Sequence, residues 1–387
     1  MADIKELKVF LEEEVKPLEA HLLNGNYDAL IPAMANFRRV ARESSFWNFP
    51  MPREFGGQEM SLEDFAPVSE LLGTSPLGHF ACNVQAPDIG NMELLLHFAT
   101  DDQKERFLKP LAAGEIRSCF GMTEPEHAGS NPIIMSTSAK KTDGGWILNG
   151  HKWFTTGADG AAFCIVMAVT NPDEVPHKRA GMFIVPTDSD GFTLLRNISI
   201  MGDAGMGYFT HGEILLTDCF VPDSNLIGNP GDGFKLAQNR LGPGRIHHCM
   251  RWIGIAERVM EMLCMQAISR QITPSKTLAD LDITRAKIAE NRARIDACRA
   301  LVHQVTAKIS GGSTERAGIS TIKFLAADML MKVVDDAIQI HGGLGVTDDT
   351  LLSFWYRHER GSRIYDGPDE VHKLVVAKEE LKKYTAS

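Results

Sequence analysis

The stretch Phe163-Cys164-Ile165-Val166-Met167-Ala168-Val169 decides how this chain is divided, because it predicts a β-strand in a sequence whose two ends have a helical pattern. Four further strand-like runs lie around it, at residues 146–150, 182–185, 192–195 and 213–216. Turn sequences such as Asp143-Gly144-Gly145 and Asp190-Gly191 separate them. Residues 117–231 are therefore predicted to form a small β-barrel or sandwich domain inserted between helical regions.

Apolar residues at helical spacing predict helices on both sides of this insertion. Residues 1–116 show spacings of three and four, beginning with Leu7, Phe10, Leu11 and Val15. After residue 232 the helical pattern returns, and apolar residues recur every seven positions at Ile288, Ile295, Val302 and Ile309. That repeat is typical of helices packed lengthwise. The sequence thus predicts an α+β protein with a helical N-terminal domain (1–116), the β domain (117–231) and a C-terminal four-helix bundle (232–387).

Composition excludes several classes of function. Hydrophobic residues make up 44% and charged residues 23% of the 387 positions, which is typical of a globular protein. The net charge of -10 provides no basic surface for nucleic acid. No apolar run approaches the ~18 residues of a membrane span. Because the chain starts with charged residues and no apolar signal segment, a cytoplasmic protein is expected.

Cysteine and histidine spacing predicts no metal site. The seven cysteines are scattered, without a Cys-x-x-Cys pair, which favours reduced and mostly buried thiols. The adjacent His247 and His248 are expected to point to different faces of a helix. The glycine motifs that bind dinucleotides or triphosphates are absent, and no serine lies in a nucleophile elbow. Nicotinamide, triphosphate and serine-hydrolase chemistry are therefore unsupported.

Three carboxylates and a histidine lie around a Gly-Pro corner near the C-terminus, in Arg363-Ile364-Tyr365-Asp366-Gly367-Pro368-Asp369-Glu370-Val371-His372. Gly and Pro break a helical pattern, so Asp366 is expected just before a helix whose first turn contains Asp369 and Glu370. Asp366 would then be presented to a ligand. An acidic N-cap with no other role is the alternative.

Two loops in the β region combine hydroxyl, aromatic and small residues. Residues 121–131 have a composition suited to clasping a polar heterocycle. Residues 149–157 place Trp153 beside Thr155 and Thr156, which suits stacking on and hydrogen bonding to a flat ring. A β-bulge with a core tryptophan is the alternative interpretation of the second loop.

Four motifs together resemble the acyl-CoA dehydrogenase family. They are Gly121-Met122-Thr123-Glu124-Pro125, Gly150-His151-Lys152-Trp153-Phe154-Thr155, Gln339-Ile340-His341-Gly342-Gly343-Leu344-Gly345-Val346 and Tyr365-Asp366-Gly367, in the family's order and approximate spacing. The resemblance covers essentially the whole chain. Within the family, residues 241–248 and 366–372 are most similar to the branch that includes the mammalian members numbered ten and eleven.

The resemblance implies an FAD enzyme that oxidises an acyl-CoA to the trans-2-enoyl-CoA. Asp366 matches the family's base, usually Glu, which removes the α-proton while the β-hydride moves to flavin N5. The enolate that develops needs donors at the carbonyl oxygen, which by resemblance are a ribityl hydroxyl and the backbone N–H of Gly367 or of the base itself. A base that works near neutral pH is expected in a largely apolar pocket.

Other roles carry over by position. Met122, Thr123, Trp153 and Thr155 match residues at the flavin ring, and Ser130 matches a serine near the flavin phosphate and the acyl-CoA entrance. Arg245 matches an arginine that orients the base loop. Gln339, Gly342 and Gly343 match a segment that reaches the FAD diphosphate of a neighbouring subunit, with Arg270 as a further cofactor contact. A cofactor site shared between subunits implies a homodimer or homotetramer. The resemblance also implies that an electron-transfer flavoprotein accepts the electrons.

This sequence departs from the family pattern at several positions. Asp366 is shorter than Glu by one methylene, which is on the order of 1.5 Å, and reaction geometry is sensitive to such shifts. Pro368 and Glu370 replace a Thr and a Gln that usually meet the FAD adenosine, so that end must be held differently. Gly244 stands where some members carry an alternative base.

Oxygen-using flavoenzymes of the same fold remain alternatives: an acyl-CoA oxidase, a flavin monooxygenase or a nitroalkane oxidase. A non-enzymatic flavin- or acyl-CoA-binding protein is another.

Overall fold

The computed structural model describes residues 3–385 and divides the chain into two compact units. One unit consists of Met1–Pro50, Gly57–Cys82 and Arg245–Ser387, and the other of Met51–Gly56 and Asn83–Gly244. We call them the bundle unit and the sheet unit. The α+β class predicted from the sequence, with helices at both ends and strands between, is confirmed.

The sheet unit is built on one eight-stranded sheet, in which seven strands follow the order β6-β7-β3-β2-β4-β5-β8 and β1 pairs with β4. Neighbours are antiparallel except where β4 meets β1 and β2. The five strands predicted from sequence are present, and β1, β2 and β8 are additional. The bounds are β1 Ser118–Gly121, β2 Ser138–Thr142, β3 Gly145–Thr156, β4 Phe163–Val169, β5 Ala180–Pro186, β6 Phe192–Asn197, β7 His211–Pro222 and β8 Leu226–Ile227.

Apolar side chains of β3, β4, β5 and β7 form the core of this unit, where Trp146 meets Phe183 edge to face at 5.6 Å. Helices α6 (Asp88–Phe98), α7 (Asp101–Gln103) and α8 (Lys109–Ala112) belong to the same unit. Buried polar groups attach α6 to β1: Asp88 accepts from the amide and hydroxyl of Ser118, and Asn91 donates to the Cys119 oxygen. These helices therefore group with the sheet.

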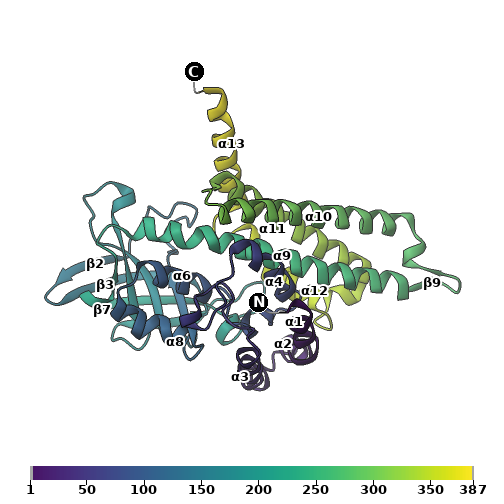
Figure 1. Cartoon of the computed structure of the whole chain (residues 1–387), viewed down its shortest axis with the longest axis horizontal. Helices are drawn as coiled ribbons and strands as arrows, with labels where there is room; N and C mark the ends of the chain where they lie inside the picture. The colour runs from purple at the N-terminus through teal and green to yellow at the C-terminus, as the bar shows by residue number, and fades with distance from the viewer. Residues whose placement is uncertain (1–2, 386–387) are drawn as a thin grey trace. The chain divides into compact units, whose positions relative to one another are not determined.

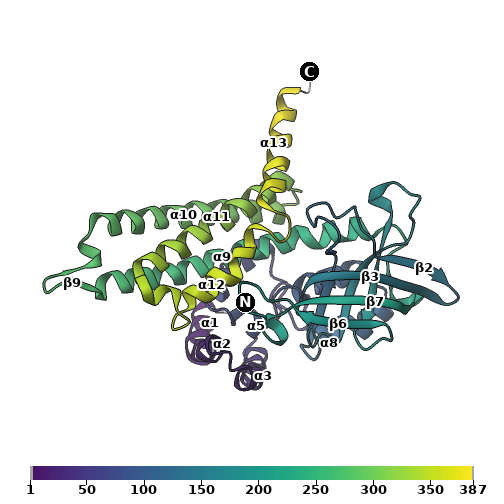
Figure 2. The same ribbon diagram turned by 180° about the vertical axis from the view of Figure 1, so that it is seen from behind.

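The bundle unit contains the remaining helices (Figures 1 and 2). Both views show α10 beside α11 and α9. Helix α9 begins in the sheet unit and continues into the bundle unit. The bounds are α1 Ile4–Phe10, α2 Glu19–Leu23, α3 Tyr27–Glu43, α4 Leu62–Gly73, α5 Gly78–Ala81, α9 Gly233–Ser269, α10 Asp282–Ser310, α11 Arg316–His341, α12 Leu351–Glu359 and α13 Asp369–Thr385, with a hairpin of β9 (Gln271–Thr273) and β10 (Lys276–Thr277) between α9 and α10.

Two glycines allow α4 and α9 to touch backbone to backbone. A Cβ on Gly254 would lie 1.9 Å from the Glu70 oxygen, and one on Gly73 would lie 2.4 Å from the Arg251 oxygen. Side chains of any size would push the two helices apart. Of the sevenfold repeat on α10, Ile295 and Val302 are fully buried and the end members only partly. The close packing of α4 fixes the part of α9 that carries residues 245–252.

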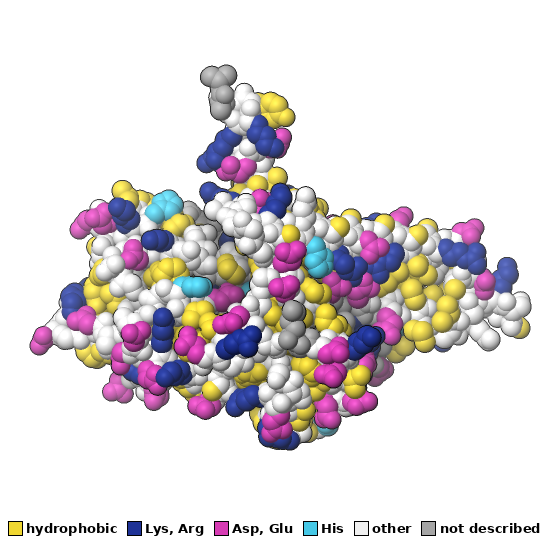
Figure 3. All heavy atoms as spheres, in the orientation of Figure 1, with side chains coloured by type: hydrophobic (Ala, Val, Ile, Leu, Met, Phe, Trp, Pro, Cys, Tyr) yellow, Lys and Arg dark blue, Asp and Glu magenta, His cyan; other side chains and the backbone are white. Residues whose placement is uncertain are grey.

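Acidic and basic side chains are mixed over the face drawn in Figure 3, and its basic residues do not form one stripe. Helix α13 leaves the bundle with Leu374, Leu381 and Tyr384 each more than half exposed (Figure 2). Within residues 3–385, no helix is long and apolar enough to cross a bilayer. Five of the seven cysteines are buried, as expected for most of them.

Candidate active site

The loop that carries Asp366 has an unusual backbone. Asp366 and Gly367 both have positive φ, 54° and 101°, a region in which an L side chain is strained and glycine is not. A Cβ on Gly367 would also lie 2.9 Å from Nε2 of His372. Helix α13 begins two residues later, with Asp369 and Glu370 in its first turn, as the sequence predicted. Asp366 is therefore presented just ahead of a helix by a backbone that requires glycine at 367.

A buried lysine ties this loop to α11. The ammonium of Lys323 donates to the backbone oxygens of Ser362 and Gly367, each at 2.7 Å, and the residue has no exposed surface. Burial lowers the pKa of Lys323 to about 8, while the carboxylates of Asp366 and Asp369 act to raise it. Since a buried donor needs its acceptors, the two carbonyls and the lysine hold one another in place.

Two other side chains contact the backbone oxygen of Asp366, the residue before Gly367. Arg245 donates to it through Nε at 2.8 Å, and the Nε2 atom of His372 lies 3.1 Å from it. Burial, with Arg245 and Lys323 nearby, lowers the pKa of His372 to about 4. The ring is then neutral at pH 7, and the contact requires the tautomer with the proton on Nε2. This hydrogen bond joins Arg245 to the loop that it is predicted to orient.

The carboxylate of Asp366 faces a histidine that the sequence analysis considered only as a metal ligand. The Nε2 atom of His248 lies 3.4 Å from Oδ2 of Asp366, and the two side chains are 17% and 21% exposed. The ring of His248 stacks on Trp252 at 5.7 Å and contacts Tyr365 at 4.9 Å. Burial lowers the pKa of His248 to about 4, although the Asp366 carboxylate acts to raise it. The imidazole is therefore neutral at pH 7.

A buried ion pair lies behind these rings. Arg251 donates to both carboxylate oxygens of Glu359 and, at 3.2 Å, to the hydroxyl of Tyr365. The indole of Trp252 donates to Glu359 at 3.0 Å. Burial acts to raise the pKa of Glu359, but the Arg251 guanidinium overcomes it and the net pKa is lowered. Trp252 and Tyr365 are thereby fixed by hydrogen bonds at the ends away from His248.

In the sheet unit, the two predicted ligand loops are joined. The hydroxyl of Thr123 donates to the Trp153 oxygen at 2.8 Å, and the Trp153 amide donates to the Thr123 oxygen at 3.1 Å. The register of β3 against β7 shifts between Lys152 and Thr155, and Phe154 has φ of 50°. The bulge of the alternative interpretation is thus present, but Trp153 is only partly buried and is not a core residue. The bulge turns this indole out of the sheet.

A second buried ion pair supports the loop at residues 121–137. Lys152 donates to Glu124 at 2.8 Å and to the Met122 oxygen at 2.9 Å. The same carboxylate accepts from the amides of Ser136 and Thr137, at 2.6 and 2.9 Å. Burial lowers the pKa of Lys152 to about 8, and Glu124 acts to raise it. Both side chains are almost inaccessible to solvent, so each depends on the other for its charge.

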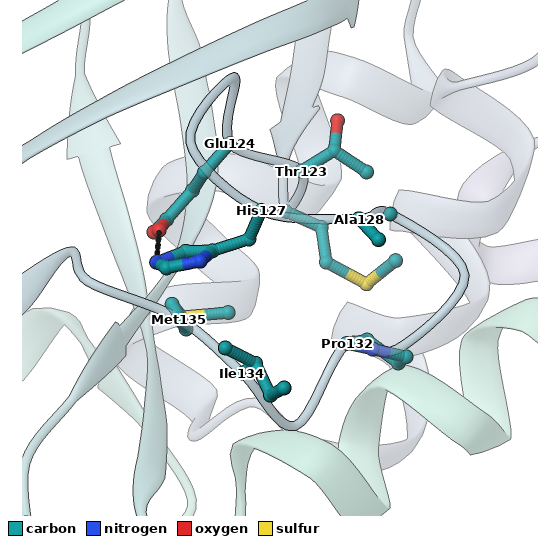
Figure 4. Close-up of a pocket in the computed structure, with 9 residues that line it drawn as sticks. Thr123, Glu124, His127, Ala128, Pro132, Ile134 and Met135 are labelled. Atoms are coloured by element: carbon teal, nitrogen blue, oxygen red, sulfur yellow. Dashed lines mark ion pairs between the residues drawn. The ribbon is translucent and has the colours of Figure 1, made fainter.

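The loop encloses a small pocket, whose wall is shown in Figure 4. His127 lies 3.7 Å from Glu124, and Ala128, Pro132, Ile134 and Met135 also line the pocket. Ser130, which lies in this loop, is exposed. The remaining residues predicted to contact the cofactor are exposed on the bundle unit, with Arg270 after α9 and Gln339, Gly342 and Gly343 at the end of α11.

Comparison with known proteins identifies the family. Residues 4–115, 119–219 and 231–381 match the N-terminal, middle and C-terminal domains of acyl-CoA dehydrogenases. This chain belongs to the acyl-CoA dehydrogenase family. The family is one of flavoprotein oxidoreductases of lipid metabolism, with FAD as the cofactor.

Two relatives and one solved structure illustrate the match. The chain is 38% identical to mouse acyl-CoA dehydrogenase family member 10 over 98% of its own length, but it spans only 36% of that protein. It is 38% identical to FadE2 of Mycobacterium tuberculosis, over 90% of this chain and 86% of the relative. A structure from Mycobacterium abscessus, described as an acyl-CoA dehydrogenase, has 36% identity and a TM-score of 0.92 over 98% of this chain and 97% of that one. The match to family member 10 agrees with the branch predicted from the sequence.

The residues of the sheet unit fit the flavin of this family. The Oγ1 atom of Thr155 is buried and has no hydrogen-bond partner within residues 3–385. It lies two residues from the partly buried Trp153, on the same bulge. A hydroxyl that lacks a partner beside an available aromatic face suits a flat heterocycle with polar edge atoms.

The surroundings of Asp366 are more polar than the sequence predicted. Trp252 and Tyr365 supply an aromatic wall, but Arg245, Lys323 and His248 also surround the loop. The reason is the positive-φ backbone, which turns carbonyl oxygens inward, where they need donors. The expectation of a largely apolar pocket is corrected in this respect.

A histidine clamp joins the ligand loop to the sheet. His151 contacts Glu126 at 2.8 Å through Nδ1 and Glu213 at 2.9 Å through Nε2, and Arg196 also binds Glu213. Burial acts to lower the pKa of His151, but the two carboxylates outweigh it and the net pKa is raised. A raised pKa in the folded state means that the clamp contributes its full stability below the unfolded pKa.

That contribution is lost as pH rises through the folded pKa of His151, which lies above the ordinary value of 6.5. We therefore expect the wild-type protein to lose thermal stability relative to His151→Gln as the pH rises from about 6 to about 8. The quantity compared is the difference between the two unfolding midpoints. Thermal unfolding of both proteins across this range measures the difference. Parallel curves for the two proteins would contradict the assignment.

Proposed function

We propose that this protein catalyses the FAD-dependent α,β-dehydrogenation of an acyl-CoA to the trans-2-enoyl-CoA, with Asp366 as the base that removes the α-proton. The observation that carries the proposal is the presentation of the Asp366 carboxylate. It stands on a strained loop whose carbonyls are held by Arg245, Lys323 and His372. Backbone strain that the surroundings maintain in this way is a feature of functional sites.

The chain's own residues would divide the work as follows. Asp366 would accept the α-proton of the thioester, and FAD, when held by the sheet unit, would supply the acceptor for the β-hydride. The backbone N–H of Asp366 or Gly367 is the expected donor to the thioester oxygen, where negative charge develops. Arg245 and Lys323 keep the base loop in one conformation and so limit the movement of the base between turnovers.

The flavin ring would be held by the sheet unit. The Thr155 hydroxyl and the Trp153 ring are the expected hydrogen-bonding and stacking groups, with Thr123 and the backbone of Met122 beside them and Ser130 toward the phosphate. The buried Glu124–Lys152 pair keeps these loops in register. The Thr155 hydroxyl and the Trp153 ring are neutral groups, so this arrangement requires no charge on the flavin.

An oligomer would complete the cofactor site. Arg245, at the base loop, and Ser269, at the end of α9, are about 36 Å apart along the helix. Asn291 of α10 donates to Asp336 at 3.1 Å, so the end of α11 with Gln339, Gly342 and Gly343 lies at the same end of the bundle as the hairpin after Arg270. From the family resemblance, we expect these residues to contact the FAD of a partner subunit. We propose a homodimer or homotetramer, with an electron-transfer flavoprotein as acceptor.

An anaerobic titration of the FAD-loaded protein with saturated acyl-CoAs of different length and branching tests the proposed function. We expect one class of acyl-CoA to bleach the flavin, with a slow return of colour in air. Bleaching followed by rapid hydrogen peroxide formation would favour an acyl-CoA oxidase. A flavin that no acyl-CoA bleaches would contradict the dehydrogenase and direct attention to nitroalkane or monooxygenase substrates.

A further inference from the structure

His248 and Arg245 lie one turn apart on α9 and meet the same residue. Arg245 donates to the backbone oxygen of Asp366 at 2.8 Å, and Nε2 of His248 lies 3.4 Å from the carboxylate oxygen Oδ2. One side chain thus holds the backbone of Asp366, and the other approaches its carboxylate.

The ring of His248 has little freedom to turn away. It stacks on Trp252 with an interplanar angle of 17°, and Tyr365 covers it from a second side with an angle of 53°. Trp252 is fully buried and bonded to Glu359, so it does not move with the ring. The Nε2 atom is therefore held toward Asp366 by packing on two sides.

The groups that face His248 favour its neutral form. The cationic groups are Arg251 on its own helix and Lys323 on α11, and His79 of α5 lies within electrostatic range; the acidic groups are Asp366 and, on α12, Glu359. Burial is the largest effect and lowers the pKa of His248 to about 4. An ionised carboxylate only accepts hydrogen bonds, so a neutral imidazole can bond to it only by donating from Nε2.

We propose that His248 is a positioning residue for Asp366, whose Oδ2 it holds through an Nε2–H donor so that Oδ1 is directed at the α-carbon of the substrate. The inference rests on the proposed role of Asp366 as the base. The separation of 3.4 Å exceeds the ordinary range of about 2.7–3.2 Å for such a bond. Hydrogen bonds at active sites are often long without substrate and shorten in the substrate complex.

The shorter base explains the need for this contact. An aspartate places its carboxylate about 1.5 Å behind that of a glutamate on the same backbone, and rates are sensitive to such displacements. The positive φ of Asp366 and its held backbone oxygen set where the side chain starts. The backbone angle and the held oxygen do not fix the rotation of the carboxylate group. His248 contacts Oδ2 and can therefore fix that rotation.

Two substitutions at 248 separate donation from packing. His248→Leu keeps the volume and removes the donor, whereas His248→Gln can place an amide N–H near the position of Nε2. We expect His248→Leu to lower the anaerobic rate of flavin reduction by about 10–100-fold, with the acyl-CoA dissociation constant nearly unchanged. His248→Gln is expected to recover most of the loss.

His247→Gln is the matched control. His247 is the next residue on α9 and is also buried, and its ring packs edge to face on Phe65 at 5.7 Å. We expect this variant to reduce its flavin at the wild-type rate. A loss equal to that of His248→Leu would overturn the proposal, because it would show that any buried histidine of this segment has the same effect.

A double-mutant cycle with Asp366→Asn tests whether His248 acts through the base. If it does, adding His248→Leu to Asp366→Asn lowers the residual reduction rate no further, whereas independent roles give multiplied losses. The unfolding midpoints of the same four proteins provide a second cycle that does not depend on turnover. Additive effects in both cycles would overturn the positioning role while the wild-type flavin is still bleached. A wild-type protein that no acyl-CoA bleaches would instead remove the proposed function, and this inference with it.

Discussion

Asp366→Asn is expected to lower the rate of flavin reduction by acyl-CoA by about 10²–10⁴-fold, which is the usual contribution of a general base. The amide occupies nearly the same volume but cannot accept the α-proton. Its backbone contacts to Arg245 and His372 are unchanged, so the fold and the acyl-CoA dissociation constant should be retained. Rapid-mixing absorbance under anaerobic conditions measures the rate, and the flavin spectrum at equilibrium measures binding.

Glu380→Gln is the control for this variant. It makes the same change from carboxylate to amide on α13, at an exposed side chain. We expect its rate to stay close to that of the wild type. An Asp366→Asn protein that reduces its flavin as fast as the wild type would remove Asp366 from the reaction.

Lys152→Met is expected to lower the free energy of unfolding of the sheet unit by about 3–5 kcal/mol, because it leaves the Glu124 carboxylate buried without its cation. The amides of Ser136 and Thr137 still donate to Glu124, but they do not replace a full charge. The loop at residues 121–137 and the adjoining bulge should loosen together, so FAD binding weakens as well. Urea unfolding and an FAD titration measure the two effects.

Two further variants show whether the effect comes from the buried charge. Lys141→Met removes a lysine from the same sheet whose partner, Asp223, lies 2.8 Å away, but both side chains are about half exposed. This change should alter the free energy of unfolding by less than about 1 kcal/mol. Adding Glu124→Gln to Lys152→Met should recover part of the loss. Equal losses for Lys141→Met and Lys152→Met would contradict the explanation.

Local patterns in the sequence were sufficient to place the elements. Strand β4 matches the predicted run at Phe163–Val169 residue for residue, and α11 extends one residue beyond each end of the predicted helix at 317–340. The Gly-Pro corner correctly placed Asp366 ahead of α13. These features depend on the periodicity of neighbouring residues and on turn residues, which a sequence displays directly.

Contacts that complete the candidate site were not predictable, because they join residues far apart in the chain. Lys323 reaches Gly367 across 44 positions, and Lys152 reaches Glu124 across 28. Neither lysine belongs to a motif that specifies its partner. The sequence did indicate that His247 and His248 face different ways on a helix. Which of them meets Asp366 depends on how the loop ahead of α13 folds back on α9, and that is a property of tertiary packing.

The identity of the CoA product after one anaerobic turnover tests the account most directly. The FAD-loaded protein is mixed with a saturated acyl-CoA that bleaches it, the reaction is stopped, and the thioester is examined by mass spectrometry and against a trans-2-enoyl-CoA standard. The account predicts a thioester that lacks two hydrogen atoms and co-elutes with the trans-2-enoyl standard, in an amount equal to the flavin reduced. A thioester that is unchanged, or that has gained oxygen once air is admitted, would contradict it.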